Sequence, residues 1–329
     1  MNNILLCDIK PFLGCNLKCS FCHERHRRNR IHETNKIYEL NYINNYFNRA
    51  LKIIKTILSS HDYDLIKLSL MGGELFQDRI SDEYIKHYNS FFERLKKEFG
   101  KTLQITIVSN LVYRNIDRLI QLTLDHDAYI QTSYDFVGRY TKPWQVETFI
   151  KNVYTLREKN IKFNVATVLH KQNIDVLMDT VDNSLKHNFH RMYDDDINMS
   201  TVMFYNNCLT SSPLYVEPKL YHKVYYQLID KYPNLTEFSN MRHRILHHDS
   251  INHYRGVIHS LSIVDKKVRF RDLTNRERNY NNKYCLTCPF YTCCSTAGVY
   301  KIDTTDQIQY NCFDRLIYQK IYDQLYKSV

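Results

Sequence analysis

The alternation of short apolar runs with longer stretches of helical periodicity constrains this 329-residue chain more than any other feature. From residue 3 to about 231, apolar runs of strand length alternate with segments in which apolar residues recur every three or four positions. Predicted strands occupy 4–13, 65–71, 103–108, 128–134, 161–169 and 197–205, and predicted helices occupy 34–58, 81–99, 114–124, 145–159, 173–187 and 217–230. This rhythm is typical of βα units.

Six βα units in series predict an α/β fold containing a partial (β/α)6 barrel similar to a TIM barrel. We place the barrel core at 1–208, a connecting region on the substrate side at 209–284, and a small cysteine-rich domain at 285–329. A linker is expected near 208–215, and residues 232–284 are the part of the chain whose pattern is least readable. In such barrels the active site lies in the loops that follow the C-terminal ends of the strands.

The cysteines are grouped, which favours metal binding or catalysis over disulfides. No run of 18 apolar residues exists, and Asp8 interrupts the N-terminal apolar stretch too early for a signal peptide, so we expect a cytoplasmic protein with no membrane segment. Thiols stay reduced in that compartment. Of the ten cysteines, Cys7 is predicted to lie in the core, and the groups are 15, 19 and 22 near one end and 285, 288, 293, 294 and 312 near the other.

The stretch GCNLKCSFCHE places Cys15, Cys19 and Cys22 in the loop after the first predicted strand. Three thiolates hold three irons of a [4Fe–4S] cubane and leave the fourth iron open to a small molecule. A structural zinc site would need a fourth ligand, which here would be His23 or His26. The spacing alone leaves both alternatives open.

The second predicted strand ends in Met71-Gly72-Gly73-Glu74. Only seven glycines occur in the chain, so an adjacent pair at a strand end predicts that the backbone approaches another group closely. The alternative interpretation is an ordinary tight turn.

In this context the chain resembles the radical S-adenosylmethionine (SAM) superfamily, in which CxxxCxxC follows the first strand of a six-unit barrel. The resemblance covers roughly residues 3–205. It implies that Cys15, Cys19 and Cys22 bind a [4Fe–4S] cluster whose open iron takes SAM, with an aromatic residue at the position of Phe21. It further implies that Gly72, Gly73 and Glu74 bind the amino group of SAM, although Leu75 replaces the usual proline of that motif.

Weaker correspondences follow at later strand ends. Ser109-Asn110 resembles the Thr-Asn pair often found after strand three, and Ser133-Tyr134-Asp135 resembles the Ser-x-Asp that meets the ribose or carboxylate of SAM. Arg139 is suited to pair with the SAM carboxylate. The resemblance therefore adds Asn110, Ser133, Asp135 and Arg139 to the predicted SAM site; the alternative is that each is an ordinary polar residue at a strand end.

The second group contains CxxC-x5-C followed by a distant cysteine. It resembles the auxiliary-cluster region of the SPASM and twitch groups, which implies one auxiliary [4Fe–4S] cluster on Cys285, Cys288, Cys294 and Cys312. Gly298 stands where the SPASM pattern has a further cysteine, and 209–284 has none, so one auxiliary cluster is expected rather than two. The spacing is also compatible with an all-cysteine zinc site or with no metal.

The resemblance implies a concrete chemistry. SAM is cleaved reductively to methionine and a 5′-deoxyadenosyl radical, which removes a hydrogen atom from a peptide or protein substrate; crosslinking, epimerisation or oxidation of a ribosomally made peptide is the expected outcome. Cys208 follows the sixth predicted strand and is a candidate hydrogen-atom donor, although a lone cysteine is commonly a small buried side chain.

The resemblance implies an electron donor such as a flavodoxin or ferredoxin. Since strand one begins almost at residue 1, we expect that a leader peptide would be held by a separate recognition protein or by the basic surface. A net charge of +10 keeps nucleic acid open as a partner. Two alternatives therefore stand: a radical SAM enzyme that modifies tRNA, a nucleotide or another small molecule, and a zinc-stabilised module that binds nucleic acid without chemistry.

Overall fold

The computed structural model has an α/β fold in which parallel strand pairs predominate. It describes residues 3–22, 40–135, 137–168, 170–187, 201–202, 216, 218–233, 235–247, 258–264, 267–272 and 313–327. The chain divides into two compact units, and the division falls inside one strand, β5. The first unit comprises Met1–Ser133, Arg139–Asn164 and Gly256–Leu273; the second comprises Tyr134–Gly138, Val165–Arg255 and Thr274–Val329.

The first unit contains most of the sheet. Its strands are β1 (Ile4–Lys10), β2 (Leu65–Leu70), β3 (Leu103–Val108), β4 (Tyr129–Ser133), β7 (Ile258–Val264) and β8 (Lys267–Asp272). They lie in the order β4-β3-β2-β1-β7-β8, and every pair is parallel except β7 with β8. The strands β1 to β4 confirm the predicted positions.

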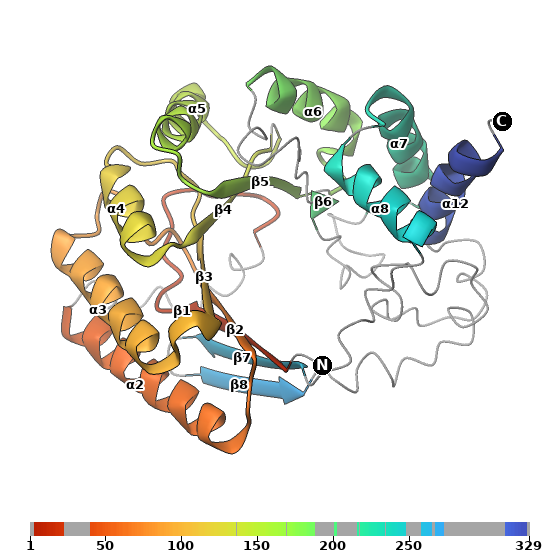
Figure 1. Ribbon diagram of the computed structural model, residues 1–329. Helices are drawn as coiled ribbons and strands as arrows, with labels where there is room; N and C mark the ends of the chain where they lie inside the picture. Colours follow the sequence, from red (N-terminus) through yellow and green to blue (C-terminus); the bar gives the residue numbers. More distant parts are fainter. Residues whose placement is uncertain are drawn as a thin grey trace. The chain divides into compact units, whose positions relative to one another are not determined.

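The helices of the first unit are α2 (Leu40–Ser60), α3 (Asp82–Phe99), α4 (Asp117–His126) and α5 (Pro143–Glu158), with a 3-10 turn η2 (Gly100–Thr102). Figure 1 shows α2, α3 and α4 on one face of the strands. Apolar positions at helical spacing produce this layer: Phe47 of α2 and Phe91 of α3 are buried, with ring centroids 4.6 Å apart. Tyr46 of α2 donates a hydrogen bond of 2.7 Å to the Ile263 carbonyl and so ties the helix to β7.

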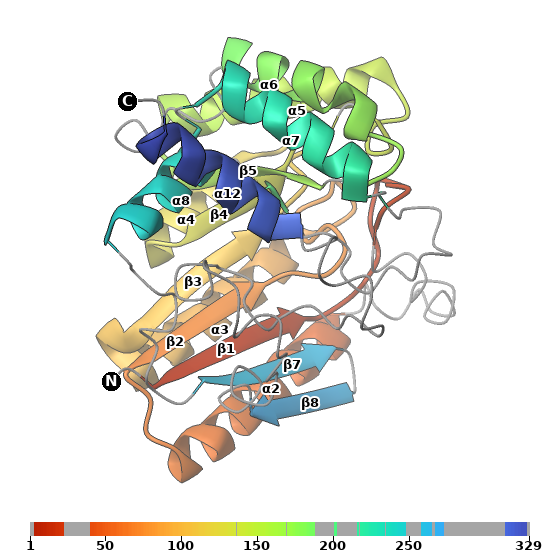
Figure 2. The same ribbon diagram turned by 90° about the vertical axis from the view of Figure 1, so that its right-hand side faces the viewer.

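The pairing of β1 with β7 was not expected from the sequence. Residues 232–284, for which no element was predicted, include the helix α8 (Thr236–His247) and the hairpin β7–β8. Ile4 to Lys10 lie opposite Ile258 to Val264 in parallel register, and Figure 2 shows the two strands side by side. One edge of the first strand is therefore covered by a segment about 250 residues further along the chain.

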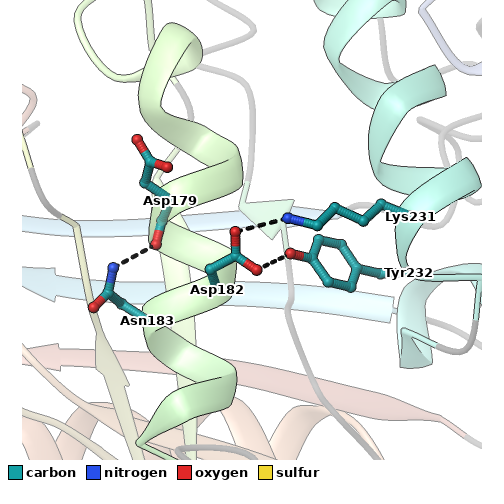
Figure 3. Close-up of polar contacts among 5 residues, drawn as sticks. All are labelled: Asp179, Asp182, Asn183, Lys231 and Tyr232. Carbon is teal, nitrogen blue, oxygen red and sulfur yellow. Dashed lines mark hydrogen bonds and ion pairs between the residues drawn. The ribbon is translucent and has the colours of Figure 1, made fainter.

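The second unit contains β5 (Phe163–Val168) from Val165 on, which pairs in parallel with β6 (Thr201–Val202). It also contains the 3-10 turn η3 (Ile174–Val176) and the helices α6 (Leu177–Lys186), α7 (Pro218–Lys231), α8 and α12 (Phe313–Tyr326). The helices share an apolar core that includes Val181, Ile229, Phe238 and Ile317. Asp182 of α6 also accepts hydrogen bonds from Lys231 and Tyr232 at the end of α7 (Figure 3).

The three-part domain division proposed from the sequence stays a prediction. Its boundaries near 208–215 and at 285 lie outside the described residues, as does the predicted auxiliary-cluster region up to residue 312. Within the described residues, no helix is both long and apolar enough to cross a membrane.

Candidate functional site

The three N-terminal cysteines lie in the loop that follows β1, as the sequence predicts. Cys15 and Cys22 are partly exposed, Cys19 is buried, and none of the three is in a disulfide. The neighbouring Phe21 is also buried. A cubane takes each thiolate on a different iron, so the loop offers the type of donor that a [4Fe–4S] cluster requires. In the described part of the chain, no three His, Cys, Asp or Glu side chains lie close enough together to bind a single metal ion.

The glycine pair after β2 makes the close approach that the sequence predicts, and the group approached is the cysteine loop. Gly73 N–H donates to the Phe12 carbonyl (3.0 Å) and Glu74 N–H donates to the Gly14 carbonyl (2.8 Å). A Cβ on Gly72 would lie 2.3 Å from the Phe12 oxygen, and one on Gly73 would lie 1.7 Å from the Gly14 oxygen. Gly72 also has a φ of 143°, which favours glycine. The close packing of Gly72 and Gly73 therefore fixes the position of the segment from Phe12 to Gly14, immediately before Cys15.

The Glu74 carboxylate is fully buried and connects the end of β2 to the end of β3. It accepts hydrogen bonds from Phe76 N–H (3.1 Å), Asn110 N–H (2.5 Å) and the Ser109 hydroxyl (3.1 and 3.2 Å). Burial raises the pKa of this carboxyl to about 7, although the hydrogen bonds and the charge of Arg139 oppose the rise. The carboxylate thus organises protein groups around the loop; a contact with SAM stays a prediction.

Two further predicted residues, Ser133 and Arg139, come together in the first unit. The Arg139 guanidinium donates a hydrogen bond of 2.7 Å to the Ser133 hydroxyl, and Arg139 is only 5% exposed. The Cys19 thiol lies 3.9 Å from the Arg139 carbonyl oxygen. A predicted anion-binding arginine is therefore held beside the cysteine loop.

Asp135 is part of a different network, inside the second unit. Its buried carboxylate accepts hydrogen bonds from Val168 N–H (3.0 Å) and the Asn173 side chain (3.3 Å). The buried His170 joins this network through its backbone N–H, which donates to Asn173 Oδ1 (2.8 Å), and burial lowers the pKa of its side chain to about 4. Asp135 thus organises the end of β5, and its predicted contact with SAM also stays a prediction.

Sequence reasoning missed several polar residues of this region. Asn16 lies between the first two cysteines and bonds to Asn110 (2.8 Å), and the buried Gln77 donates to the Gly14 carbonyl (3.3 Å). Their one signal in the sequence is that short polar side chains stand in loops at strand ends, where they bond to nearby backbone. Cys7, by contrast, is 1% exposed, and burial raises the pKa of its thiol, which confirms it as a core residue.

One face of the first unit's sheet, here called the basic face, carries more cations than carboxylates. In β1 from Leu5 on, in β2, and in β7 from His259 on, buried residues alternate with partly exposed ones, so the partly exposed side chains share one face. One row across this face runs Thr106, Ser69, Asp8, Ser262 and Arg269. Asp8 is the one carboxylate on this face in the described strands, whereas the cations are Lys10, Lys67, Lys267, Arg269 and Arg271.

Comparison with known proteins identifies a family model and several similar structures. Residues 9–183 match the model described as the radical SAM superfamily. No curated protein sequence matches the chain. A solved structure of native anSMEcpe with bound AdoMet aligns with a TM-score of 0.64 at 12% identity, covering 99% of this chain and 100% of that one.

Two further structures are similar. Native anSMEcpe with bound AdoMet and Cp18Cys peptide aligns with a TM-score of 0.59 at 14% identity, covering 99% of this chain and all of the other. Streptococcus suis SuiB bound to S-adenosylmethionine aligns with a TM-score of 0.47 at 15% identity, covering 89% of this chain and 72% of SuiB. At these identities the anSMEcpe alignments establish a shared fold.

Proposed function

Since this chain belongs to the radical SAM superfamily, we propose that it cleaves SAM reductively and removes a hydrogen atom from a peptide or protein substrate. The observation that carries the proposal is the family match over residues 9–183, which includes both the cysteine loop and the glycine pair packed on it. The family implies a [4Fe–4S] cluster and SAM, and the thiols of Cys15, Cys19 and Cys22 are donors of the type such a cluster takes.

Different residues of the chain would bind the [4Fe–4S] cluster and SAM. Cys15, Cys19 and Cys22 would hold three irons and leave the fourth for the amino and carboxylate groups of SAM. When bound, such a cluster would supply the single electron for reductive cleavage of SAM to methionine and the 5′-deoxyadenosyl radical. Gly72 and Gly73 let the backbone after β2 lie against the loop. Arg139, whose guanidinium is fixed by Ser133, offers a planar donor to the SAM carboxylate.

A peptide substrate is the first choice. The anSMEcpe structure solved with a bound peptide has the same fold as this chain over nearly its full length. The excess of cations on the basic face supports a substrate with acidic residues, because cations attract carboxylates over distances of about the Debye length. The reaction proposed is crosslinking, epimerisation or oxidation of a ribosomally made peptide.

The test of the chemistry is anaerobic reconstitution of the whole chain. About eight irons per chain, the content of two cubanes, together with release of 5′-deoxyadenosine on reduction in the presence of SAM, is the expected result. Replacement of Cys15, Cys19 and Cys22 by Ala should abolish the release and remove about half of the iron. Two zinc ions and intact SAM would instead support the zinc-stabilised nucleic-acid-binding module.

The C-terminal cysteines would hold the auxiliary cluster. We assign it to Cys285, Cys288, Cys294 and Cys312 on their spacing. Replacing all four by Ala should leave about four irons per chain and preserve SAM cleavage, since the auxiliary site is not the one that takes SAM. Loss of zinc and no loss of iron would assign that site to zinc.

Cys208 is proposed as a hydrogen-atom donor in an epimerisation. Cys208→Ala should then stop formation of the epimerised product while 5′-deoxyadenosine is still released. An unchanged product with intact turnover would exclude this role.

The cellular setting follows from the proposed chemistry. A cytoplasmic location would keep ten cysteines reduced and give access to a flavodoxin or ferredoxin as the electron donor. If the substrate has a leader peptide, a separate recognition protein is the proposed partner that holds it.

The same basic face favours a second candidate, the modification of tRNA or a nucleotide. Phosphate binding would make activity on RNA fall steeply with salt, by a power law that reflects the number of phosphates contacted. Activity on an acidic peptide, with no cleavage of SAM coupled to RNA, would exclude this candidate.

A further inference from the structure

We propose that the Asn110 carboxamide donates a hydrogen bond to the Cys15 thiolate and thereby raises the reduction potential of the cluster that this loop holds. The inference rests on the proposed function, since it assumes that Cys15 is a cluster ligand. Asn110 would then be a positioning residue that acts on the cluster through a sulfur atom, rather than only a contact for SAM.

The side-chain nitrogen of Asn110 lies within hydrogen-bonding distance of the Cys15 sulfur. Asn110 Nδ2 lies 3.5 Å from Cys15 Sγ and 2.8 Å from Asn16 Oδ1. The backbone N–H of Leu17 lies 3.4 Å from the same sulfur. Cys15 therefore receives one donor from its own loop and a second donor from the end of β3, 95 residues away in the sequence.

The orientation of the amide is determined by its neighbours. Asn110 Oδ1 accepts the backbone N–H of Val112 at 2.8 Å, so the NH2 group is the part that faces Cys15 and Asn16. The Asn16 amide is oriented in the same way, because its NH2 group donates to the Val112 carbonyl and its oxygen is left to face Asn110. Exchanging oxygen and nitrogen in either amide would place like groups together.

The loop that presents Asn110 is held rigidly. The backbone N–H of Asn110 donates to the Glu74 carboxylate, and the Asn110 residue is only 9% exposed. The next residue, Leu111, adopts a φ of 56°, which a non-glycine side chain disfavours and which the surrounding bonds must therefore enforce. Asn152 provides two of them by donating to the Leu111 carbonyl (2.9 Å) and the Tyr113 carbonyl (2.8 Å).

The expected consequence is electrostatic. Reduction adds one negative charge to the cluster, part of which resides on the ligating sulfurs. An N–H group aimed at a thiolate stabilises the reduced form more than the oxidised form, so the reduction potential rises. A higher potential makes electron transfer from the donor protein more favourable.

The test is a potentiometric titration of reconstituted protein, followed by the electron paramagnetic resonance signal that changes when SAM is added. Asn110→Asp keeps the shape and the acceptor for Val112 but replaces the donor with a carboxylate oxygen. We expect it to reduce the equilibrium constant for one-electron reduction by at least about tenfold, which corresponds to about 59 mV. Asn110→Leu, which only removes the donor, should shift the potential in the same direction by less.

Asn152→Leu is the matched control. It removes a buried amide that donates to the Leu111 and Tyr113 carbonyls and not to a cysteine sulfur. Asn110 keeps its own bonds to Glu74 and Val112, so the variant should reduce stability and leave the potential near that of the wild type. An unchanged potential in Asn110→Asp and Asn110→Leu, or an equal shift in Asn152→Leu, would overturn the inference. If neither Asn110 variant folds, electron–nuclear double resonance on wild-type protein with 15N in the asparagine side chains decides: absence of a 15N coupling contradicts the proposal.

Failure of the proposed function can be distinguished from failure of the proposed hydrogen bond. A wild-type chain that takes up no iron at the N-terminal cysteines refutes the cluster itself. A wild-type chain that takes up the cluster and cleaves SAM, with a potential insensitive to Asn110, refutes only the hydrogen bond.

Discussion

Glu74 and Asp135 are both fully buried carboxylates that follow a strand, yet they serve different purposes in the two units. Glu74 binds the end of β3 and, through Asn110, extends to the sulfur of Cys15. Asp135 binds Val168 and Asn173, which stabilises the end of β5. A buried carboxylate at a strand end is therefore insufficient to identify a functional site. The site is identified by the groups that the hydrogen-bond partners of the carboxylate contact in turn.

The largest effect is expected from the glycine contact in the first unit. Gly73→Ala would place a methyl group on the Gly14 carbonyl, so the cysteine loop must move. We expect a loss of about 3 kcal/mol of stability or more and loss of the N-terminal iron, measured by urea unfolding and iron content. Gly100→Ala, where nothing lies within 4 Å, should keep its iron despite a φ of 54°. Normal iron content in Gly73→Ala would show that the loop does not need this contact.

The next effect concerns the titration of Glu74. Its pKa is raised from 4.5 to about 7 on folding, so the folded chain binds the proton more tightly. Its stabilising contribution is present below about pH 4.5 and is lost as the pH rises through about 7. Glu74→Gln should flatten this decline, which amounts to about 3 kcal/mol.

Urea unfolding at several pH values between 4 and 8 measures the change for Glu74→Gln. Glu83→Gln is the control, because Glu83 is exposed at the start of α3 and its pKa is lowered rather than raised. An equally steep decline in the Glu74 variant would mean that another group titrates.

The Asp135 network should give a moderate and local effect. Asn173→Ala removes donors to Asp135 (3.3 Å) and to the Val168 carbonyl (2.6 Å). Hydrogen bonds to charged groups contribute roughly 1.5–3 kcal/mol, so a loss of about 2 kcal/mol is expected. The content of N-terminal iron should not change. Loss of that iron would show that the second unit also supports the cysteine loop and would weaken the contrast drawn above.

The smallest effect is expected at the surface contact of Figure 3. Tyr232→Phe removes the hydroxyl that donates to Asp182, while Lys231 still donates to the other carboxylate oxygen. The expected loss is less than about 1 kcal/mol, because a partly exposed Asp182 regains water. Thermal unfolding compared with the wild type checks this value. A loss as large as that of Asn173→Ala would mean that this surface contact is as important as the buried network.

The local elements of the fold could be predicted from the sequence, and the long-range pairing could not. Runs such as Leu65–Leu70 and Leu103–Val108 are apolar and short, and they became β2 and β3. Three of the seven residues of β7 are polar, and the adjacent pair His259-Ser260 interrupts the alternation expected of a strand, so its pattern is weak. Its position beside β1 depends on contacts between residues about 250 positions apart, which periodicity does not report.

The candidate site shows the same limit. The cysteine spacing and the glycine pair are local patterns, and they predicted the loop and the close approach. The hydrogen bonds among Asn110, Asn16 and Cys15 were not predictable, because they join the loop after β3 to the loop after β1. A polar residue at a strand end suggests a functional site, but the orientation of its side chain is determined only when the strands have assembled into the sheet.

The pairing of β1 with β7 has a consequence for biosynthesis. On the ribosome, β2 emerges soon after β1, but β7 ends at residue 264, so one edge of the nascent sheet stays unpaired while about 190 more residues are made. At typical elongation rates this takes roughly 10 to 40 seconds. An open strand edge can pair with other chains, so chaperone protection during translation would benefit this protein.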